Sequence, residues 1–439
     1  MYRDNEIPIF NQIDILFIVL FFASFTSSVI ATGFSIALLL YTRYGIEGEV
    51  KGLILLTFRG VLSSAVASGS GNSIIRWIVL LGLSLLIILT KVHKDDEYWK
   101  LNNILFLLGL FSVVVAVMSL FSSSYPITAV FKVVSFTLPF YAILKGVYAT
   151  RDYVRWEDYV CLLMTILMLI SAVLIPFGRF RIVNSDFQGI FNHVNTMGTM
   201  CAIFIGIVLN SGWYKERVRL KWTVIFLTLI MCYLSASRTG LLSALLVIVF
   251  YAIFKMKSVT TRLIVSIVML FLVFIFWTAV SVDSSNAIMH AIHEFMWKNS
   301  TNSIIDSRAE IIANSLARFR SNMITGTGFM VPYSSYIKSY SLSFDLIVEP
   351  GNLIYMLLGD TGIVGTVLFA ALMLSILFKG NFENIYLLIA ALMINMGEMV
   401  FFSSNNYAIL LYFLIALYLF DNEKEFTDYD EIEYSSSGI

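Results

Sequence analysis

Apolar runs long enough to cross a lipid bilayer recur along nearly the whole chain. A spanning helix needs about 20 apolar residues. At the N-terminal end, Ile13–Tyr41 fits either one long helix or a tight pair, and Leu53–Ala67 either spans or re-enters. Clear runs of this kind then follow at 72–91, 101–120, 125–145, 156–175, 194–211, 218–235, 239–256, 260–281, 352–378, 383–402 and 406–420. This pattern predicts an all-α polytopic membrane protein with about 12–14 transmembrane helices.

The composition agrees with this class of protein. Hydrophobic residues make up 59% of the chain and charged residues 13%, about half the charged share of a soluble domain. The net charge is zero, so nothing suggests a nucleic-acid partner. Cys161, Cys201 and Cys232 all lie in apolar runs, which argues against a disulfide framework or a zinc site. Met1–Gln12 is polar and no cleavable signal follows it.

Basic residues fall in alternate short loops, which predicts an orientation. One set of loops has few basic residues. It has none in 121–125 or 402–406 and only Arg179 and Arg181 in 176–193. Cytoplasmic loops carry an excess of Lys and Arg, so we expect the basic loops and both termini to be cytoplasmic. The basic set is Lys91, Lys94, Lys100, Lys145, Arg151, Arg155, Lys215, Arg217, Arg219, Lys221, Lys255, Lys257, Arg262 and Lys379.

The spacing of these runs divides the chain into four predicted parts. Residues 1–281 form an N-terminal transmembrane bundle, 282–351 an extracytoplasmic loop, 352–420 the C-terminal transmembrane helices and 421–439 a disordered cytoplasmic tail. The loop is too long for a simple connector, which makes it a functional candidate. Within it, "SIIDSRAEIIANSLARF" has the stripe of an amphipathic helix with Arg308 on its flank. We expect the following "TGTGF" to be a flexible turn.

Polar and charged side chains gather at the predicted outer ends of the spans. Charge inside a membrane is costly and usually has a function. Two arginines, two acids and a histidine at one depth indicate an anionic ligand and a proton transfer. The residues are Arg238 in "SASRTG", His193 and Asn195 in "FNHVNTMG", Glu349 and Asn352 around "EPGN", Glu398 in "INMGEMVFF" and Arg308 in the outer loop.

Each of these residues also has a purely structural interpretation. Arg238 fits an ordinary anchor at the membrane interface. His193 fits a helix-end histidine, Glu398 a helix cap or a structural pair, and Asp360 a buried structural acid.

Two other features have simple interpretations. Gly362 and Gly365 are typical of helices that approach closely. His290 and His293, with Glu294, resemble half a metal site, but a third well-placed ligand is missing. We therefore expect neither a metal nor a cofactor.

Four motifs in order resemble one family, the O-antigen ligase and polymerase superfamily of bacterial cell-surface polysaccharide enzymes. They are "FQGIFNHVNTMG", "LSASRTGLL", "DSRAEIIANSLARF" followed by "GTGF", and "GNLIYMLLGDTGIVG", over about residues 180 to 380. The resemblance implies a metal-independent, GT-C-type glycosyltransferase in the bacterial cytoplasmic membrane. Its donor would be a glycan on undecaprenyl diphosphate and its acceptor a sugar hydroxyl on the outer face.

The same resemblance implies roles for the polar residues. Arg238 and Arg308 would hold the donor diphosphate, because guanidinium forks suit phosphate oxygens. We expect Asn195 and Asn352 to contact the substrate.

A general base would take the proton of the acceptor hydroxyl. Glu398, Glu349 and His193 are the candidates, and a carboxylate is favoured.

One departure separates two branches of the family. Ligases carry a histidine, then Asn, Ser or Gln, then nine residues, then GxxG. Here Asn352, the segment 353–361, Gly362 and Gly365 fit, but Gly351 takes the place of the histidine. A glycine cannot shuttle a proton, so the motif favours a polymerase of lipid-linked repeat units over a ligase.

Two further readings stay open at this point. The chain could be an O-antigen ligase, or a lipid-linked oligosaccharide flippase or other transporter, although it has one dominant outer loop and no internal repeat. The expected partners are the lipid-linked oligosaccharide, membrane lipid and a polysaccharide chain-length regulator. The polymer would be O-antigen, capsule or exopolysaccharide.

Overall fold

The protein is described here by a computed structural model, in which the regular elements are helices. The structure describes residues 8–69, 72–177, 186–256, 258, 260–268, 309–334, 338–343, 346 and 351–420. The elements are α1 (Gln12–Ala23), α2 (Ser28–Ala37), η1 (Leu38–Tyr44), α3 (Gly45–Gly60), α4 (Ser73–Leu89), α5 (Tyr98–Ser122), α6 (Pro126–Thr150), α7 (Trp156–Val173), α8 (Val194–Asn210), α9 (Gly212–Lys215), α10 (Val218–Leu234), α11 (Arg238–Phe254), α14 (Ala309–Ser321), α15 (Leu353–Lys379), η4 (Phe382–Asn384), α16 (Ile385–Ile394) and α17 (Ala408–Phe420).

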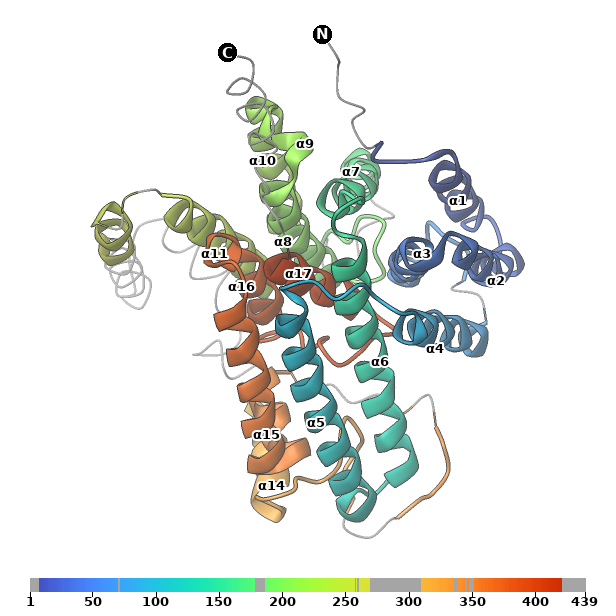
Figure 1. The fold of residues 1–439 in the computed structure, drawn as a ribbon, viewed down its shortest axis with the longest axis vertical. Coiled ribbons are helices and arrows are strands. Elements are labelled where there is room, and N and C mark those ends of the chain that lie inside the picture. The colour runs from blue at the N-terminus through green and yellow to red at the C-terminus, as the bar shows by residue number, and fades with distance from the viewer. Residues whose placement is uncertain are drawn as a thin grey trace, which may run out of the picture.

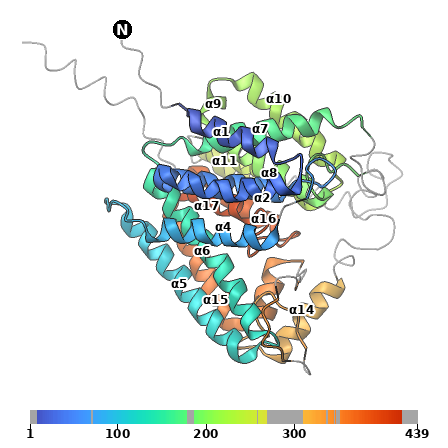
Figure 2. The same cartoon turned by 90° about the vertical axis from the view of Figure 1, so that its right-hand side faces the viewer.

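The helices form two connected groups. α5, α6 and α15 run side by side along the long axis, and α14 lies against the lower part of α15 (Figure 1). α1, α2 and α4 run roughly parallel to one another and cross the direction of α5 and α6 (Figure 2). Every residue of α17 is buried, because this helix lies in the middle and packs on α6 and α16. The predicted all-α membrane fold is confirmed.

Five helical segments are long and apolar enough to cross a membrane. They are Ser28–Gly60, Tyr98–Ser122, Pro126–Thr150, Trp156–Val173 and Leu353–Lys379. The other apolar helices in the described part of the chain have 10–17 residues, so several are shorter than the spans expected from the sequence. The expected span 383–402, for example, is helical only to Ile394, and a turn follows it.

The N-terminal ambiguity is resolved as a pair of helices. α1 ends at Ala23, and the Ser27 side chain caps α2 by accepting a hydrogen bond from the Ile30 amide. α3 ends at Gly60, so the segment Leu53–Ala67 leaves the helix halfway. The carbonyl that follows this helix end, on Val61, accepts a hydrogen bond from a backbone amide just before α8.

Loops predicted to be cytoplasmic gather at one end of the helices. The Arg151 guanidinium pairs with Asp95 at 2.6 Å and with Glu97 at 2.9 Å. Lys255, after α11, lies 3.7 Å from Glu383, before α16. Several basic loops therefore share one end, as the charge pattern requires. Which side of the membrane that end faces stays a prediction.

α15 is broken near its first third, at Gly362. This residue has φ +63° and ψ −166° inside an otherwise helical segment, and only glycine adopts such backbone angles easily. The close-packing role expected for Gly362 is therefore incomplete, since the glycine also breaks the helix. Gly365 has the expected role, because a Cβ there would lie 3.2 Å from Val115 of α5.

The long loop before α15, which the sequence predicts to be extracytoplasmic and which is called the outer loop below, supplies hydrogen bonds for the break in α15. Residues 323–328 run against the broken segment 359–364, so the predicted flexible turn "TGTGF" is packed in place, with Thr327 and Phe329 buried. A break in a membrane helix frees backbone groups that need new partners. The Thr327 and Gly328 amides donate to the Gly359 and Asp360 carbonyls at 3.0 and 3.1 Å, and the Ile363 amide donates to the Met323 carbonyl at 2.8 Å.

A buried ion pair fastens α14 to the same place. One oxygen of Asp360, which is 1% exposed, lies 2.7 Å from Nη2 of Arg318 on α14. The other accepts a hydrogen bond from the Met330 amide at 2.7 Å. Arg318 also donates to the Thr327 hydroxyl at 2.9 Å. These contacts give Asp360 a structural role, the interpretation that its sequence position suggested.

We expect Gly362→Ala to destabilise the protein. A Cβ at this position would lie 2.4 Å from the Ile324 carbonyl oxygen, and the positive φ adds strain, so we expect a cost of about 1–3 kcal/mol. The measurement is the thermal unfolding midpoint of the purified protein in detergent. Gly109→Ala is the matched control, because a Cβ there meets nothing within 4 Å. Equal midpoints for the two variants would contradict the assigned break.

Candidate active site

The N-terminal ends of α8 and α11 touch at two glycines. A Cβ on Gly240 would lie 2.4 Å from the Gly198 carbonyl carbon, and a Cβ on Gly198 would lie 2.2 Å from the Ser237 Cβ. Only helices without side chains at these points can approach so closely. Arg238, the first residue of α11, is thereby placed beside the first turns of α8.

The turn after α16 packs against the same helix end. A Cβ on Gly397 would lie 1.9 Å from the Thr239 hydroxyl oxygen. Gly397 precedes Glu398, and Thr239 follows Arg238. The two predicted charged residues are thus each adjacent in the chain to a residue of this contact.

A direct hydrogen bond joins two of the predicted residues. The Asn195 side-chain amide donates to Oε1 of Glu398 at 2.8 Å. Both side chains are half-buried, and they lie 203 positions apart in the sequence. The bond fixes the direction of the carboxylate at the junction of α8, α11 and the turn after α16.

His193 caps α8. Its Nδ1 accepts a hydrogen bond from the Asn195 amide at 3.1 Å. When Nδ1 is the acceptor, the neutral imidazole carries its proton on Nε2. In this geometry the exposed face of His193 donates a hydrogen bond rather than accepting a proton.

Asn352 holds the turn that carries Glu398. It caps α15 through its side-chain oxygen, and its amide nitrogen donates to the Met396 carbonyl at 2.9 Å. The Leu353 amide donates to the Asn395 carbonyl at 3.0 Å. These contacts give Asn352 a structural role, and its predicted contact with a substrate stays a prediction.

Asn395 braces the turn from inside, a role that the sequence did not suggest. It is fully buried. Its oxygen accepts hydrogen bonds from the Val400 and Phe401 amides at 2.8 and 2.7 Å, and its nitrogen donates to the Ala391 carbonyl at 2.6 Å. The position of Glu398 therefore depends on this neutral side chain.

Two arginines outside the predicted set lie at the same end of the bundle. Arg76 donates to the Asn405 carbonyl at 2.7 Å, in the turn that begins after α16. Arg59 donates to the Ser24 hydroxyl at 2.9 Å and to nearby carbonyls. Both are buried, and within the described residues neither forms an ion pair with an acid. Arg76 brings positive charge to the turn between α16 and α17, the turn in which Glu398 also lies.

Two predicted residues cannot be placed. Arg308 and Glu349 lie outside the described residues. The predicted pairing of Arg238 with Arg308, and the predicted role of Glu349, therefore stay predictions.

Comparison with known families gives this geometry a context. Residues 222–370 match the family model described as O-antigen ligase. The match supports the superfamily that the four sequence motifs resemble. It includes α11, α14 and the break in α15, and it supports a membrane glycan-processing function of ligase or polymerase type acting on lipid-linked oligosaccharides. A search of curated proteins found no match to the chain.

We expect Asn395→Ala to loosen the turn that holds Glu398. The change leaves two buried amides without their acceptor, which costs about 1–3 kcal/mol for each group. The thermal unfolding midpoint in detergent measures this cost. Asn103→Ala removes an exposed amide of α5 and serves as the control. An unchanged midpoint for the Asn395 variant would show that the turn is held elsewhere.

Proposed function

We propose that the protein is a polymerase of undecaprenyl-diphosphate-linked oligosaccharide repeat units, acting at the outer face of the bacterial cytoplasmic membrane. It would be a metal-independent, GT-C-type glycosyltransferase that makes a cell-surface polysaccharide. The observation that carries the proposal is the hydrogen bond from Asn195 to Glu398 at the junction where Arg238 begins α11. The proposed base is thus bonded to an oriented amide, beside the helix end that carries the proposed cation.

The positively charged side chains would stabilise the leaving group, undecaprenyl diphosphate. Arg238 and Arg308 would hold the diphosphate of the donor, and negative charge builds on that diphosphate as the glycosidic bond breaks. The N-terminus of α11 adds partial positive charge from its unpaired amides. Fixed positive charge at this place lowers the barrier for departure of the undecaprenyl diphosphate.

Glu398 is the base that the contacts favour. The acceptor hydroxyl would attack the anomeric carbon, the bond to the diphosphate would break, and the hydroxyl proton would pass to the carboxylate. His193 is less suited, because its Nδ1 already accepts the Asn195 amide. Glu349, which lies outside the described residues, stays a second candidate.

The conformation at Gly351 favours the polymerase over the ligase. This glycine has φ +67°, a backbone conformation that glycine adopts more easily than any residue with a side chain. The ligase motif needs a histidine at this position, and the backbone here suits a glycine. The docked outer loop also argues against a flippase, since part of the loop is built into α15 instead of forming a short connector.

Arginine variants test the proposed diphosphate clamp. We expect Arg238→Ala and Arg308→Ala to abolish long polymer while single repeat units are still exported, and Arg238→Lys to rescue only partly, because a point charge loses the bidentate grip. Surface glycan chain length in a complemented deletion strain is the measurement. Arg219→Ala, at the exposed start of α10, is the control.

The alternatives give different results in the same strains. Long polymer that forms but is not transferred to a lipid anchor would support the ligase. Single units that accumulate on the cytoplasmic face would support the transporter. Full activity of Arg308→Lys would argue against the clamp.

We expect Glu398→Gln to lower polymer formation by at least 100-fold, because general-base catalysis contributes about 10²–10⁴ in rate. The amide keeps the shape of the side chain, so protein level should be unchanged. Asp152→Asn removes an exposed acid and serves as the control. Normal chain length in the Glu398 variant would move the base to Glu349.

A further inference from the structure

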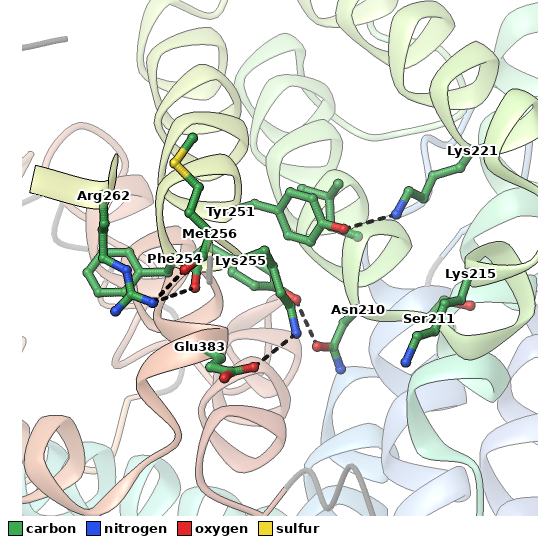
Figure 3. A pocket seen from close by; sticks show the side chains of 12 residues that line it. Asn210, Ser211, Lys215, Lys221, Tyr251, Phe254, Lys255, Met256, Arg262 and Glu383 are labelled. Atoms are coloured by element: carbon green, nitrogen blue, oxygen red, sulfur yellow. Dashed lines mark hydrogen bonds and ion pairs between the residues drawn. The ribbon is translucent and has the colours of Figure 1, made fainter. Parts of the chain in front are cut away.

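A cavity of about 470 Å³ lies at the end of α8 and α11 that is opposite to the candidate active site. It opens between the last turns of these helices, the start of α10 and the segment before α16 (Figure 3). Four basic side chains line it, Lys215, Lys221, Lys255 and Arg262, with one acid, Glu383. Four positive charges against one negative charge leave a net charge of +3.

The lysine inside the cavity is held on an aromatic ring. Lys221 is 8% exposed, and its ammonium donates to the Tyr251 hydroxyl at 3.1 Å. It also lies 5.1 Å from the centre of the Tyr251 ring. Lys255 lies 3.7 Å from Glu383, the acid that lines the cavity. Lys221 forms no ion pair within the described residues, and a buried cation without a close acid favours an anionic ligand.

Arg262 has one buried hydrogen-bond donor that is not satisfied within the described residues. Its Nη2 donates to the Met256 carbonyl at 2.9 Å, and its guanidinium lies 5.4 Å from the centre of the Phe254 ring. Its Nε is buried and has no hydrogen-bond partner within the described residues. A buried donor without a partner is costly, and a phosphate oxygen would satisfy it. Figure 3 places Arg262 and Lys221 on two sides of Tyr251 and Lys255.

Exposed apolar side chains lie close in the sequence to Lys221 and Arg262 of the cavity. Val218, Trp222 and Phe226 are exposed along one face of α10, and Leu263 and Ile267 are exposed beside Arg262. The cavity therefore combines a cationic interior with apolar flanks, which suits a ligand with an anionic head and hydrocarbon tails. Its volume falls in the usual range for ligand pockets.

We propose that this cavity binds the headgroup of an anionic diacyl phospholipid. Basic pockets between membrane helices on the cytoplasmic side are a known way to hold such headgroups. The basic loops around this cavity belong to the set expected to face the cytoplasm, so the lipid would come from the cytoplasmic leaflet. The site lies away from Glu398 and does not depend on the proposed glycosyltransferase activity.

Binding to the purified full-length protein tests the proposal. Native mass spectrometry and thermal shift in detergent would be measured with phosphatidylglycerol, phosphatidylcholine and inorganic phosphate. We expect bound phosphatidylglycerol and a raised unfolding midpoint, with little effect of the other two. Equal binding of phosphatidylcholine would overturn the headgroup specificity. An equal shift with inorganic phosphate would reduce the cavity to a phosphate site and overturn the lipid.

Two substitutions locate the binding. We expect Lys221→Gln with Arg262→Gln to weaken phosphatidylglycerol binding at least ten-fold, whereas Arg219→Gln, which removes an exposed charge next to the cavity, leaves it unchanged. If the double variant fails to fold, Arg262→Lys alone should still bind but more weakly, because it loses the fork. Wild-type affinity for phosphatidylglycerol in the double variant and in Arg262→Lys would contradict the proposal.

Sidedness is tested separately. The native cysteines in the described residues are buried, so Lys215→Cys introduces an accessible thiol. We expect a membrane-impermeant thiol reagent to label it in inside-out vesicles and not in intact spheroplasts. Labelling in spheroplasts would assign the cavity to the other leaflet and overturn the cytoplasmic part of the proposal.

Discussion

The arrangement of α15 and the loop before it depends on hydrogen bonds for buried backbone amides and carbonyls. Gly362 breaks α15, and a broken membrane helix leaves amides and carbonyls that lipid cannot satisfy. Residues 323–328 of the outer loop provide the missing partners. The ion pair between Arg318 and Asp360 holds the loop in place while it does so. Loop and helix are therefore one unit, although they are separated in the sequence.

This unit is connected to the candidate active site through the first part of α15. That part begins with Asn352, whose amide holds the Met396 carbonyl. Two residues further, Glu398 accepts the bond from Asn195. The docked loop, the first part of α15 and the turn that carries Glu398 are thus linked by hydrogen bonds and by the chain itself.

The sequence predicted what depends on composition and depth. Long apolar runs identified the membrane helices, and costly polar residues at their ends pointed to His193, Asn195, Arg238 and Glu398, which the fold brings to one region. The sequence could not predict which of these side chains contact each other, because the hydrogen bond from Asn195 to Glu398 joins residues 203 positions apart. Gly362 was ambiguous for a different reason, since a glycine that permits close packing and one that breaks a helix look alike in sequence. Packing supplied by the outer loop decided between them.

The depth of the site follows from helix lengths. α11 has 17 residues and is therefore about 25 Å long, less than the roughly 30 Å hydrocarbon core. Phe402, four residues after Glu398, packs against Phe136 at 4.8 Å between ring centres, and Phe136 lies near the middle of α6. We infer that, in a bilayer that α6 spans, the turn with Glu398 lies below the headgroup level. A water-soluble sugar nucleotide would have to leave water to reach it, whereas a donor carried on a polyprenyl lipid is already at that depth and can enter sideways from the bilayer.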